Sequence, residues 1–354
     1  MTDEWWPELG PQWEPTTAEK PPGRTIDVHS HLIVDASAEV ANPHFKPEMD
    51  PRTFFSPEVT KRYNKEFRAQ PHIAAKFREP AARIEDMDKQ GIDMQVIAIA
   101  PPQYYYWLDA EVAPRAVHLQ HERFAEVVRE HPDRFVAVAN LPMDHPELAV
   151  EVMREAKENY GFHGFELNGD VNGADYDERR FDVVWEAAEE LEMTAILHPM
   201  GFTDGQRMDD YYLVNVICMP LASTVAVSRM ILGGVWERFP DFNMVVVHGG
   251  GYLPFYFART DHAFGVRPEL RHHIDRLPSE YLHKLHFDTA VFKPEMVRYL
   301  IDEFGAEKVL MGTDYPFDMG PTDPLGFLAD VPMTERERSL VLGDNAARLF
   351  KIGG

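Results

Sequence analysis

The 354-residue chain contains a single cysteine, Cys218, and comparatively few cationic side chains. One cysteine excludes an intrachain disulfide framework and a cluster of thiolate metal ligands. Lysine and arginine together number 35 against 59 aspartates and glutamates, which gives a formal net charge of −24. Nucleic acids and anionic membrane surfaces bind cationic patches, so this balance argues against both kinds of partner. A small anionic substrate stays compatible, because a bound cation or local arginines reverse the potential inside a cleft.

We also find neither a targeting signal nor a long apolar run in the sequence. The N-terminal segment MTDEWWPELGPQWEPTTAEKPPG has neither the basic region nor the apolar core of a signal peptide, so we expect a cytoplasmic protein. We find no apolar run close to the roughly 20 residues that cross a bilayer. Residues 1–23 are rich in proline and acidic side chains, and they contain three tryptophans. We predict that they form an extended arm packed on the body or on a neighbouring subunit.

The rest of the chain, residues 24–354, alternates short apolar runs with helical patterns, which is typical of repeated βα units. Eight strands that alternate with helices favour a single (β/α)₈ TIM barrel over an open sheet. The predicted strands are Thr25–Val34, Met94–Ile99, Phe135–Ala139, Gly164–Leu167, Thr194–Leu197, Met244–Val247, Leu285–Phe287 and Lys308–Met311. The predicted helices include Ala81–Gln90, Pro114–Glu130, Pro146–Glu158, Phe181–Leu191 and Pro294–Phe304.

One long segment, residues 36–78, interrupts this alternation after the first strand. It is aromatic and punctuated by prolines, as in NPHFKPEMDPRTFFSPEV. A loop of this length inside a barrel is more often functional than idle. We therefore expect an insertion loop that lies over the carboxyl-terminal mouth of the barrel.

Polar side chains stand where several predicted strands end. Catalytic residues of such barrels lie at the carboxyl ends of the strands, which meet at one rim. The residues at these ends are four histidines and two aspartates: His29, His31, His198, His248, Asp288 and Asp314. The sequence therefore predicts a site at this rim.

The spacing of His29 and His31 places both side chains on the same face of a strand. Two imidazoles on one face can hold one ion, and nitrogen and carboxylate ligands suit Zn²⁺, with Mn²⁺ or Fe²⁺ as alternatives. Taken alone, an HxH pair is more often a chance match than a metal site. His198 alone could be a hydrogen-bonded histidine of the core, and Asp314 alone could be a turn residue. Their joint occurrence at successive strand ends shifts the balance toward a metal site.

The motifs HxH, HP, HGGG and GTDYPF occur in this order along the chain, as do longer segments such as GQRMDDYYLVNVICMPLASTVAVSRMILGGVWERFP and HGGGYLPFYFARTDHAFGVRPEL. This arrangement resembles the metal-dependent amidohydrolase superfamily. More narrowly, it is similar to the branch around aminocarboxymuconate semialdehyde decarboxylase and the related aromatic-acid decarboxylases. The resemblance covers most of the chain from Ile26 onward, and it implies a mononuclear metal site in a barrel.

The resemblance implies roles for individual positions. His29, His31, His198 and Asp314 match the metal ligands, and His248 matches the catalytic histidine that activates metal-bound water. In the decarboxylation that we predict, His248 and Asp314 would handle the proton that replaces CO₂ on carbon. A cation lowers the pKa of its bound water toward neutrality, and a nearby histidine can move that proton.

Three further positions match residues that contact the substrate. Arg259 matches an arginine that holds the substrate carboxylate in a neighbouring subunit's site, which implies a homodimer. Phe317 and Trp107 fall where aromatic side chains line the pocket.

The chain also departs from the pattern of this branch. The other substrate-binding arginine of the family aligns close to Pro71, and Arg78, Lys76 or Arg68 could replace it. Of these we predict Arg78. On the fourth strand, Glu166 adds a carboxylate that could face the pocket, although we expect it to face solvent or a helix. These departures bear on the substrate and leave the metal site intact.

We predict a metal-dependent, non-oxidative decarboxylase of an aromatic or ring-cleavage-derived unsaturated carboxylic acid, acting in aromatic catabolism with one Zn²⁺, or Mn²⁺ as the alternative. The main rival is a metal-dependent hydrolase or hydratase of a ring-fission product on the same scaffold. Nothing local in the sequence separates CO₂ loss from water addition, and the fold does not decide between them. A non-catalytic metal-binding barrel is a weaker rival, because it would have no reason to retain every ligand and His248.

Overall fold

Strands β1 (Ile26–Leu32) and β2 (Met94–Ile99) are buried at every position in the computed structural model, which describes residues 13–49, 65–202, 207–208 and 210–353. Burial on both faces is characteristic of parallel strands covered by helices. Six shorter strands follow, and every pair of neighbours runs parallel. They are β3 (Phe135–Ala137), β4 (Gly164–Leu167), β5 (Thr194–Leu197), β6 (Met244–Val246), β7 (His286–Asp288) and β8 (Val309–Leu310).

The strands close into a ring through two narrow seams. Ladder hydrogen bonds group them as β1–β3 and β4–β8. At one seam Ala139, just beyond β3, bridges to Phe165 in β4. At the other, which we call the β8/β1 seam, the segment after β8 returns to β1, where the His31 N–H donates to the Tyr315 carbonyl at 2.7 Å. The predicted (β/α)₈ barrel is therefore confirmed.

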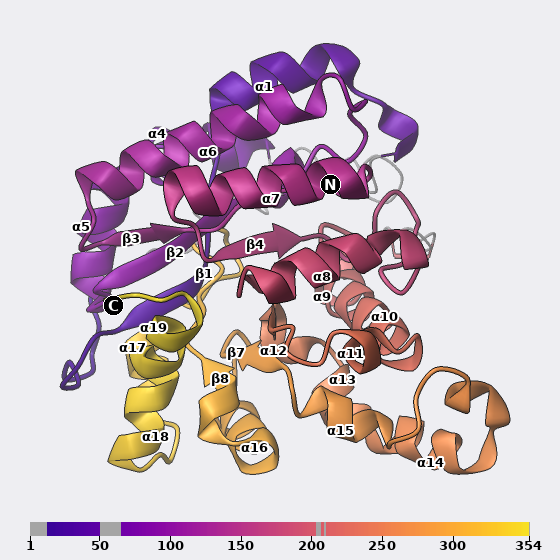
Figure 1. Ribbon diagram of the computed structural model, residues 1–354. Helices are drawn as coiled ribbons and strands as arrows, with labels where there is room; N and C mark the ends of the chain where they lie inside the picture. The colour runs from indigo at the N-terminus through magenta and orange to yellow at the C-terminus, as the bar shows by residue number, and fades with distance from the viewer. Residues whose placement is uncertain (1–12, 50–64, 203–206, 209, 354) are drawn as a thin grey trace.

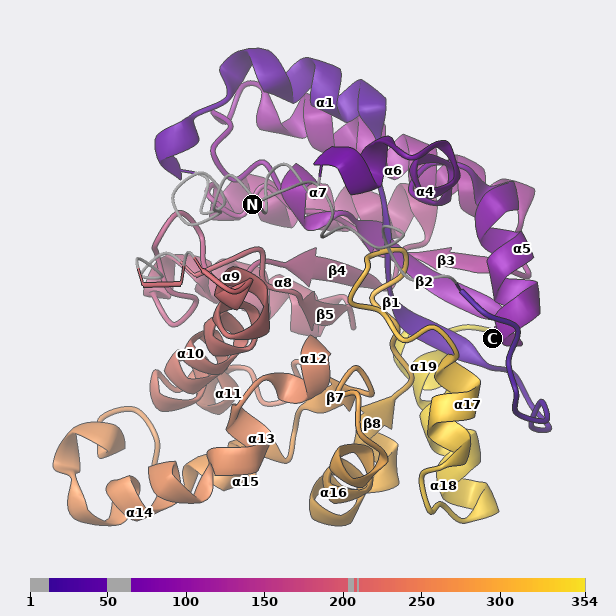
Figure 2. The same ribbon diagram turned by 180° about the vertical axis from the view of Figure 1, so that it is seen from behind.

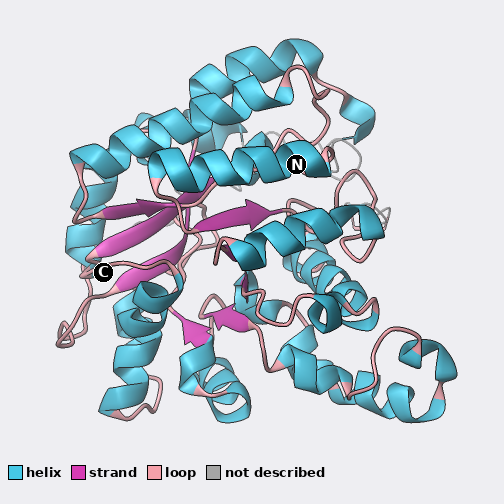
Figure 3. Ribbon diagram, in the orientation of Figure 1, coloured by secondary structure: helices cyan, strands magenta, loops and turns pink. Residues whose placement is uncertain are grey.

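Helices surround this ring, with the strands at its centre (Figures 1 and 3). The five predicted helices are present with ends shifted by at most two residues: α5 (Pro80–Gln90), α6 (Ala113–Glu130), α7 (Pro146–Tyr160), α8 (Asp182–Glu190) and α16 (Pro294–Phe304). Proline opens α5, α7 and α16, where its fixed φ suits the first turn and its missing N–H costs nothing. Gly91 and Gly161 end α5 and α7 in the left-handed conformation that glycine adopts without strain.

The second half of the chain adds further helices. They include α10 (Cys218–Leu232), α14 (Ala258–Val266), α15 (Pro278–Leu282), α17 (Pro324–Ala329), α18 (Glu335–Ser339) and α19 (Asn345–Leu349). The α14–α15 segment extends away from the barrel in both views (Figures 1 and 2).

The insertion after the first strand contains helices, although its sequence predicts a loop. It includes α1 (Asp35–Ala41) and α4 (Pro71–Lys76), and α1 lies along α6 in Figure 1. Residues 50–64 of the insertion are outside the described residues. Of the described part, Phe77 packs edge-on against Phe317 with ring centroids 5.1 Å apart. The insertion thus reaches the side of the barrel on which the strands end.

The described part of the N-terminal arm packs on the barrel. Trp13 is 7% exposed, and its ring centroid lies 5.1 Å from that of Tyr315. The Lys76 ammonium lies 4.1 Å from the centre of the Trp13 ring, and the Thr17 N–H donates to Asp323 Oδ2 at 2.8 Å. The other two tryptophans of the arm lie outside the described residues.

One helical stretch, Leu213–Leu232, is long and apolar enough to cross a membrane by length and composition. The expectation that no apolar run approaches this length does not account for this stretch, because Asn215 and Pro220 interrupt its apolar residues. The stretch comprises α9 (Leu213–Val216) and α10, and 44% of its apolar window is buried inside the structure. A helix that packs on a barrel passes the same test, so this stretch is weak evidence for a membrane span.

Candidate metal centre and active site

Five residues that the sequence singles out gather at the carboxyl ends of the strands. His29 and His31 lie in β1, His198 follows β5, His248 follows β6 and Asp314 follows β8. The structure brings all five side chains together, with imidazole ring centroids of neighbouring histidines 4.6–5.3 Å apart.

The carboxylate of Asp314 is the centre of this cluster. Its Oδ1 lies 3.3 Å from Nε2 of His29, 3.2 Å from Nε2 of His31 and 3.6 Å from Nε2 of His198. The Nε2 of His248 lies 3.8 Å from the other oxygen, Oδ2. The three imidazoles of His29, His31 and His198 and the carboxylate of Asp314 thus direct one nitrogen or oxygen each toward a common point.

These four atoms are buried, and none makes a well-formed hydrogen bond with a described residue. Unpartnered buried polar atoms cost free energy, so several at one point indicate a missing ligand. Three imidazole nitrogens and one carboxylate oxygen are donors that divalent ions such as Zn²⁺ and Mn²⁺ accept. The residues present therefore fit a divalent metal ion.

The electrostatics of the cluster agree with a cation site. Burial alone would raise the pKa of Asp314, but the adjacent imidazoles outweigh it and hold that pKa well below its ordinary value. Burial lowers the pKa of His31 and of His198, which favours the neutral imidazole that binds a metal. Burial opposes the charged form of His29 as well, yet Asp314 and Asp288 outweigh it and raise its pKa to about 10. A cation that enters the site must displace that proton.

The backbone that presents these side chains is itself unusual. Asp314 and His248 both adopt positive φ angles, of 60° and 54°. Left-handed residues other than glycine are sparse and gather at functional sites, where the surrounding structure has to hold them. Next to Asp314, the N–H and hydroxyl of Thr313 donate to the buried Asp27 at 3.1 and 2.7 Å. Asp27 also accepts from the His29 N–H at 3.0 Å, so one carboxylate fixes both sides of the cluster.

Asp288 is a functional candidate for which the sequence indicates no role beyond its place at a strand end. Its Oδ2 lies 2.6 Å from Nδ1 of His29, and its Oδ1 accepts from the Gly249 N–H at 2.7 Å. A carboxylate on the far nitrogen of an imidazole fixes the tautomer that leaves the other nitrogen free for a metal. No local sequence pattern predicts this contact, because it joins β1 to β7, two strands that are far apart in the sequence.

The expectation that Glu166 faces solvent or a helix is wrong. Its side chain is 1% exposed, and its Oε1 lies 3.8 Å from Nδ1 of His31. Burial raises the pKa of this carboxyl well above the ordinary value. In a barrel strand buried on both faces, polarity does not reveal which side a glutamate takes.

The predicted substrate residues occupy different places. The Phe317 ring packs edge-on against His31, with centroids 5.2 Å apart, so it borders the cluster. Trp107 packs against Tyr105 and lines a pocket near the ends of β4 and β5. Arg259 is exposed on α14.

The two arginines of the insertion differ in their contacts. Arg78 forms a two-pronged ion pair with Asp35, with Nε–Oδ2 and Nη2–Oδ1 distances of 2.7 and 2.9 Å. The guanidinium of Arg68 lies 5.5 Å from the centre of the Phe317 ring, the ring that borders the cluster. Arg68 thus packs on the ring that borders the cluster, and Arg78 pairs with a carboxylate of the protein.

Comparison with known proteins places these residues in a wider context. The sequence model of a protein family described as amidohydrolase matches residues 26–352. The chain is 29% identical over 337 residues to 2-amino-3-carboxymuconate-6-semialdehyde decarboxylase of Dictyostelium discoideum, covering 92% of this chain and 91% of that protein. It is 27% identical over 285 residues to gamma-resorcylate decarboxylase of Rhizobium sp. (strain MTP-10005), covering 77% and 87%. A solved dihydroxybenzoic acid decarboxylase from Polaromonas sp. JS666, with bound manganese, has a TM-score of 0.79 at 22% identity, covering 94% of this chain and 98% of that one.

Proposed function

The chain belongs to the amidohydrolase family, and on that premise we propose that it is a metal-dependent decarboxylase of an aromatic or ring-cleavage-derived unsaturated carboxylic acid. The observation that carries the proposal is the set of unpartnered imidazole nitrogens and the Asp314 oxygen around one point, with His248 beside it. Both relatives named above are decarboxylases, and each covers more than three quarters of this chain.

We further propose that one ion is held by His29, His31, His198 and Asp314. Zn²⁺ is the first candidate and Mn²⁺ the alternative. Three imidazoles and a carboxylate with an open position form a donor set that zinc enzymes use. When bound, the ion supplies Lewis-acid polarisation of a substrate oxygen next to the carbon that loses CO₂.

His248 is placed to manage the proton. In the proposed reaction the bond between carbon and the departing carboxylate breaks, and a C–H bond forms at the same carbon. One proton is consumed for each CO₂ released, and no oxidant or reductant is needed. The imidazole of His248 donates that proton and regains one from solvent, which a side chain with 18% exposure at the cluster edge allows. Oδ2 of Asp314 lies 3.8 Å from Nε2 of this imidazole.

The substrate carboxylate needs a cationic partner beyond the metal. We propose Arg68 for this contact, because its guanidinium lies 5.5 Å from the centre of the Phe317 ring, which in turn packs against His31. A guanidinium binds a carboxylate through two parallel hydrogen bonds. Phe317 and Trp107 would flank the substrate with their rings.

We also propose a cytoplasmic homodimer in which Arg259 reaches the site of the partner. Arg259 is exposed on α14, a segment that projects from the barrel (Figure 1). Exposed apolar side chains accompany it, with Tyr256 at 67% and Val266 at 62% exposure. Exposed apolar groups of this kind commonly mark protein–protein contacts.

The test is a screen of hydroxybenzoates and ring-cleavage acids with the Zn²⁺- or Mn²⁺-loaded protein, in which CO₂ release and substrate loss are both measured. We expect equal amounts of CO₂ released and acid consumed, with activity lost on chelation and restored by metal. Turnover without CO₂ would replace the proposal by the hydrolase or hydratase. Absence of any turnover by metal-loaded protein would favour the non-catalytic barrel.

An Asp288→Asn variant is expected to bind the metal about 10–100-fold more weakly, because His29 loses the carboxylate that fixes its tautomer. Competition with a coloured chelator measures the affinity. Asp302→Asn on the exposed face of α16 is the matched control, and it should bind metal as the parent does. Unchanged affinity in Asp288→Asn would show that His29 is not held through this contact.

A further inference from the structure

The stretch that follows β8, residues 311–323, carries Asp314, and we call it the ligand segment. The described part of the N-terminal arm packs on it. Near the end of the ligand segment, the Glu14 N–H of the arm donates to the Thr322 carbonyl at 3.2 Å. The arm and the segment that carries a proposed metal ligand thus touch, although almost the whole barrel separates them in the sequence.

Tyr315, the residue after Asp314, buries its side chain in a small apolar cluster that is distinct from the barrel core. The arm supplies one ring of this cluster, and the insertion after the first strand supplies three further side chains. The ring of the arm lies 5.1 Å from that of Tyr315, with an angle of 60° between the ring planes. We call it the Tyr315 cluster, and its buried members are Trp13, Phe67, Ile73, Phe77 and Tyr315.

Polar contacts surround the same tyrosine. The Tyr315 hydroxyl donates to Asp86 Oδ2 at 2.9 Å, and Lys76, whose ammonium also contacts the arm, lies 2.6 Å from that oxygen. The buried guanidinium of Arg83 lies 4.7 Å from the centre of the Tyr315 ring, and it donates to the His31 carbonyl at 2.6 Å. The Tyr315 side chain is therefore linked to the arm on one side and to the HxH strand on the other.

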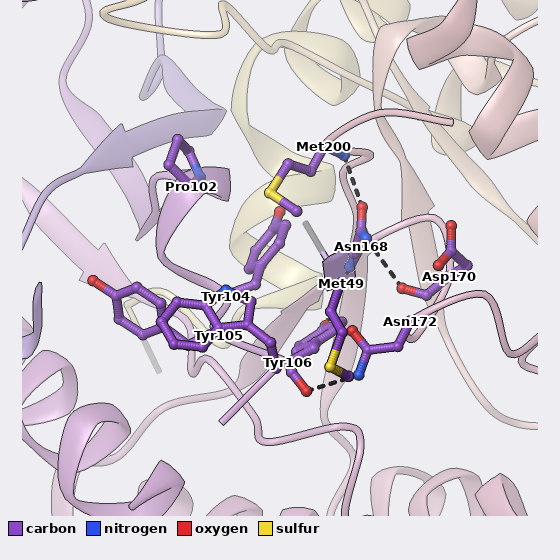
Figure 4. A pocket seen from close by; sticks show the side chains of 10 residues that line it. Met49, Pro102, Tyr104, Tyr105, Tyr106, Asn168, Asp170, Asn172 and Met200 are labelled. Atoms are coloured by element: carbon purple, nitrogen blue, oxygen red, sulfur yellow. Dashed lines mark hydrogen bonds between the residues drawn. The ribbon is translucent and has the colours of Figure 1, made fainter. Parts of the chain in front are cut away.

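The histidines of the proposed ligand set are held by the barrel itself. Two of them lie in β1. After β5, the Tyr104 hydroxyl donates to the His198 carbonyl at 3.0 Å, and the Met200 N–H donates to Asn168 Oδ1 at 2.7 Å (Figure 4). Asp314 differs, because its left-handed φ angle of 60° has to be stabilised by its surroundings. It is thus the proposed ligand beside which the arm packs.

We propose that Trp13 is a positioning residue of the metal centre, so that docking of the N-terminal arm and binding of the ion strengthen each other. With Trp13 in place, the Tyr315 ring stays buried and the backbone at Asp314 keeps its left-handed conformation. Terminal segments open locally at a lower free energy than the body of a domain, so the arm can detach while the barrel stays folded. This inference rests on the proposed function, and it adds control of the metal centre by a segment outside the barrel.

The coupling has to be reciprocal. If docking of the arm raises the affinity for the ion by some factor, the ion raises the docking equilibrium of the arm by the same factor. Two independent measurements therefore test the proposal, one on the ion and one on the arm.

The first experiment measures the Zn²⁺ affinity of full-length Trp13→Ala by competition with a chelator, well below the temperature of unfolding. We expect the affinity to be about 5–10-fold weaker than that of the parent, in the lower part of the range for coupled sites. Trp13→Phe keeps an aromatic ring on Tyr315 and should bind Zn²⁺ as the parent does. Equal affinity in Trp13→Ala and the parent would overturn the proposal.

Trp236→Phe is the matched control for general loss of stability. Trp236 is a fully buried tryptophan in α11 (Val235–Arg238) that stacks on Phe242, and it is not a member of the Tyr315 cluster. This variant loses packing in the body of the protein, and we expect its Zn²⁺ affinity to equal that of the parent. A loss as large as that of Trp13→Ala would assign the effect to destabilisation and contradict the positioning role.

Hydrogen exchange on the unmutated protein measures the reciprocal effect and needs no variant to fold. In the docked arm the N–H groups of Glu14, Thr16 and Thr17 are all hydrogen-bonded to the barrel. We expect Zn²⁺ to slow their exchange about 5–10-fold and to leave the last turn of α7 unchanged. Exchange of the arm that Zn²⁺ does not alter would overturn the proposal.

The same measurements separate this inference from the proposed function. A parent protein that binds no Zn²⁺ would contradict the proposed centre and the role of Trp13 with it. Zn²⁺ binding that is coupled to the arm, without CO₂ release from any acid, would contradict the decarboxylase and keep the role of Trp13. Release of CO₂ without any coupling would do the reverse.

Discussion

A His29→Ala variant is expected to lose bound metal and decarboxylase activity together. His29 contributes one of the three imidazole nitrogens around the Asp314 oxygen, and it is the one that Asp288 holds in place at 2.6 Å. Alanine removes the donor and leaves Asp288 buried without its partner. We expect kcat/KM to fall by at least about 10³-fold, more than the 10–100-fold typical of residues that only orient a ligand. Elemental analysis of the purified variant should find little metal where the parent has one ion per chain.

The control for this variant is His118→Ala, which removes an imidazole from the exposed side of α6, where it pairs with Glu122 at 3.1 Å. It should keep both metal and activity. If His29→Ala retained its metal and lost activity, His29 would act in the chemistry rather than in metal binding. If it retained both, the proposed centre would be wrong.

A His248→Asn variant is expected to separate chemistry from metal binding. Asparagine tolerates the left-handed conformation, so it can take the 54° φ angle of His248 without new strain. His248 lies beside Asp314 Oδ2, away from the oxygen that the other three imidazoles face. We expect kcat to fall about 10²–10⁴-fold, the range for loss of a general acid or base, with metal content unchanged.

Single-turnover rates measured alongside metal analysis test this variant. A drop in metal content that parallels the drop in rate would make His248 a ligand. A rate equal to that of the parent would remove it from the proton path.

The sequence predicts the barrel well because the signals for its elements are local. Each predicted strand is a short apolar run, and Pro294 and Pro146 mark helix starts that the structure also has. The gathering of His29, His31, His198, His248 and Asp314 is predictable for a related reason. The two histidines of HxH lie in the carboxyl half of the first strand and the other three residues follow a strand, and a parallel barrel brings these ends to one rim.

Other features depend on contacts between distant segments. Asp288 meets His29 only because β7 and β1 lie on the same side of the closed barrel. Glu166 faces inward, but its strand has only four residues, too few for the sequence to predict which side of the barrel each side chain takes. The sequence suggests that Arg78 is available to bind a substrate, whereas in the structure it pairs with Asp35 of α1. The helices of the insertion are not predicted from the sequence either, because its prolines interrupt the helical periodicity.

The β8/β1 seam joins the first strand of the barrel to be synthesised with the segment that follows the last one. Asp27 accepts hydrogen bonds from Thr313 on one side and from the backbone of His29 on the other, so the seam and the candidate centre are built from the same residues. The ribosome makes the imidazole pair of β1 at the start and Asp314 close to the end, which at the usual rate of elongation is an interval on the order of tens of seconds. Throughout that interval the nascent protein has two imidazoles without their carboxylate. With the ligand set that we propose, full coordination of an ion becomes available only when the last strand docks, and we expect metal uptake to report that the ring has closed.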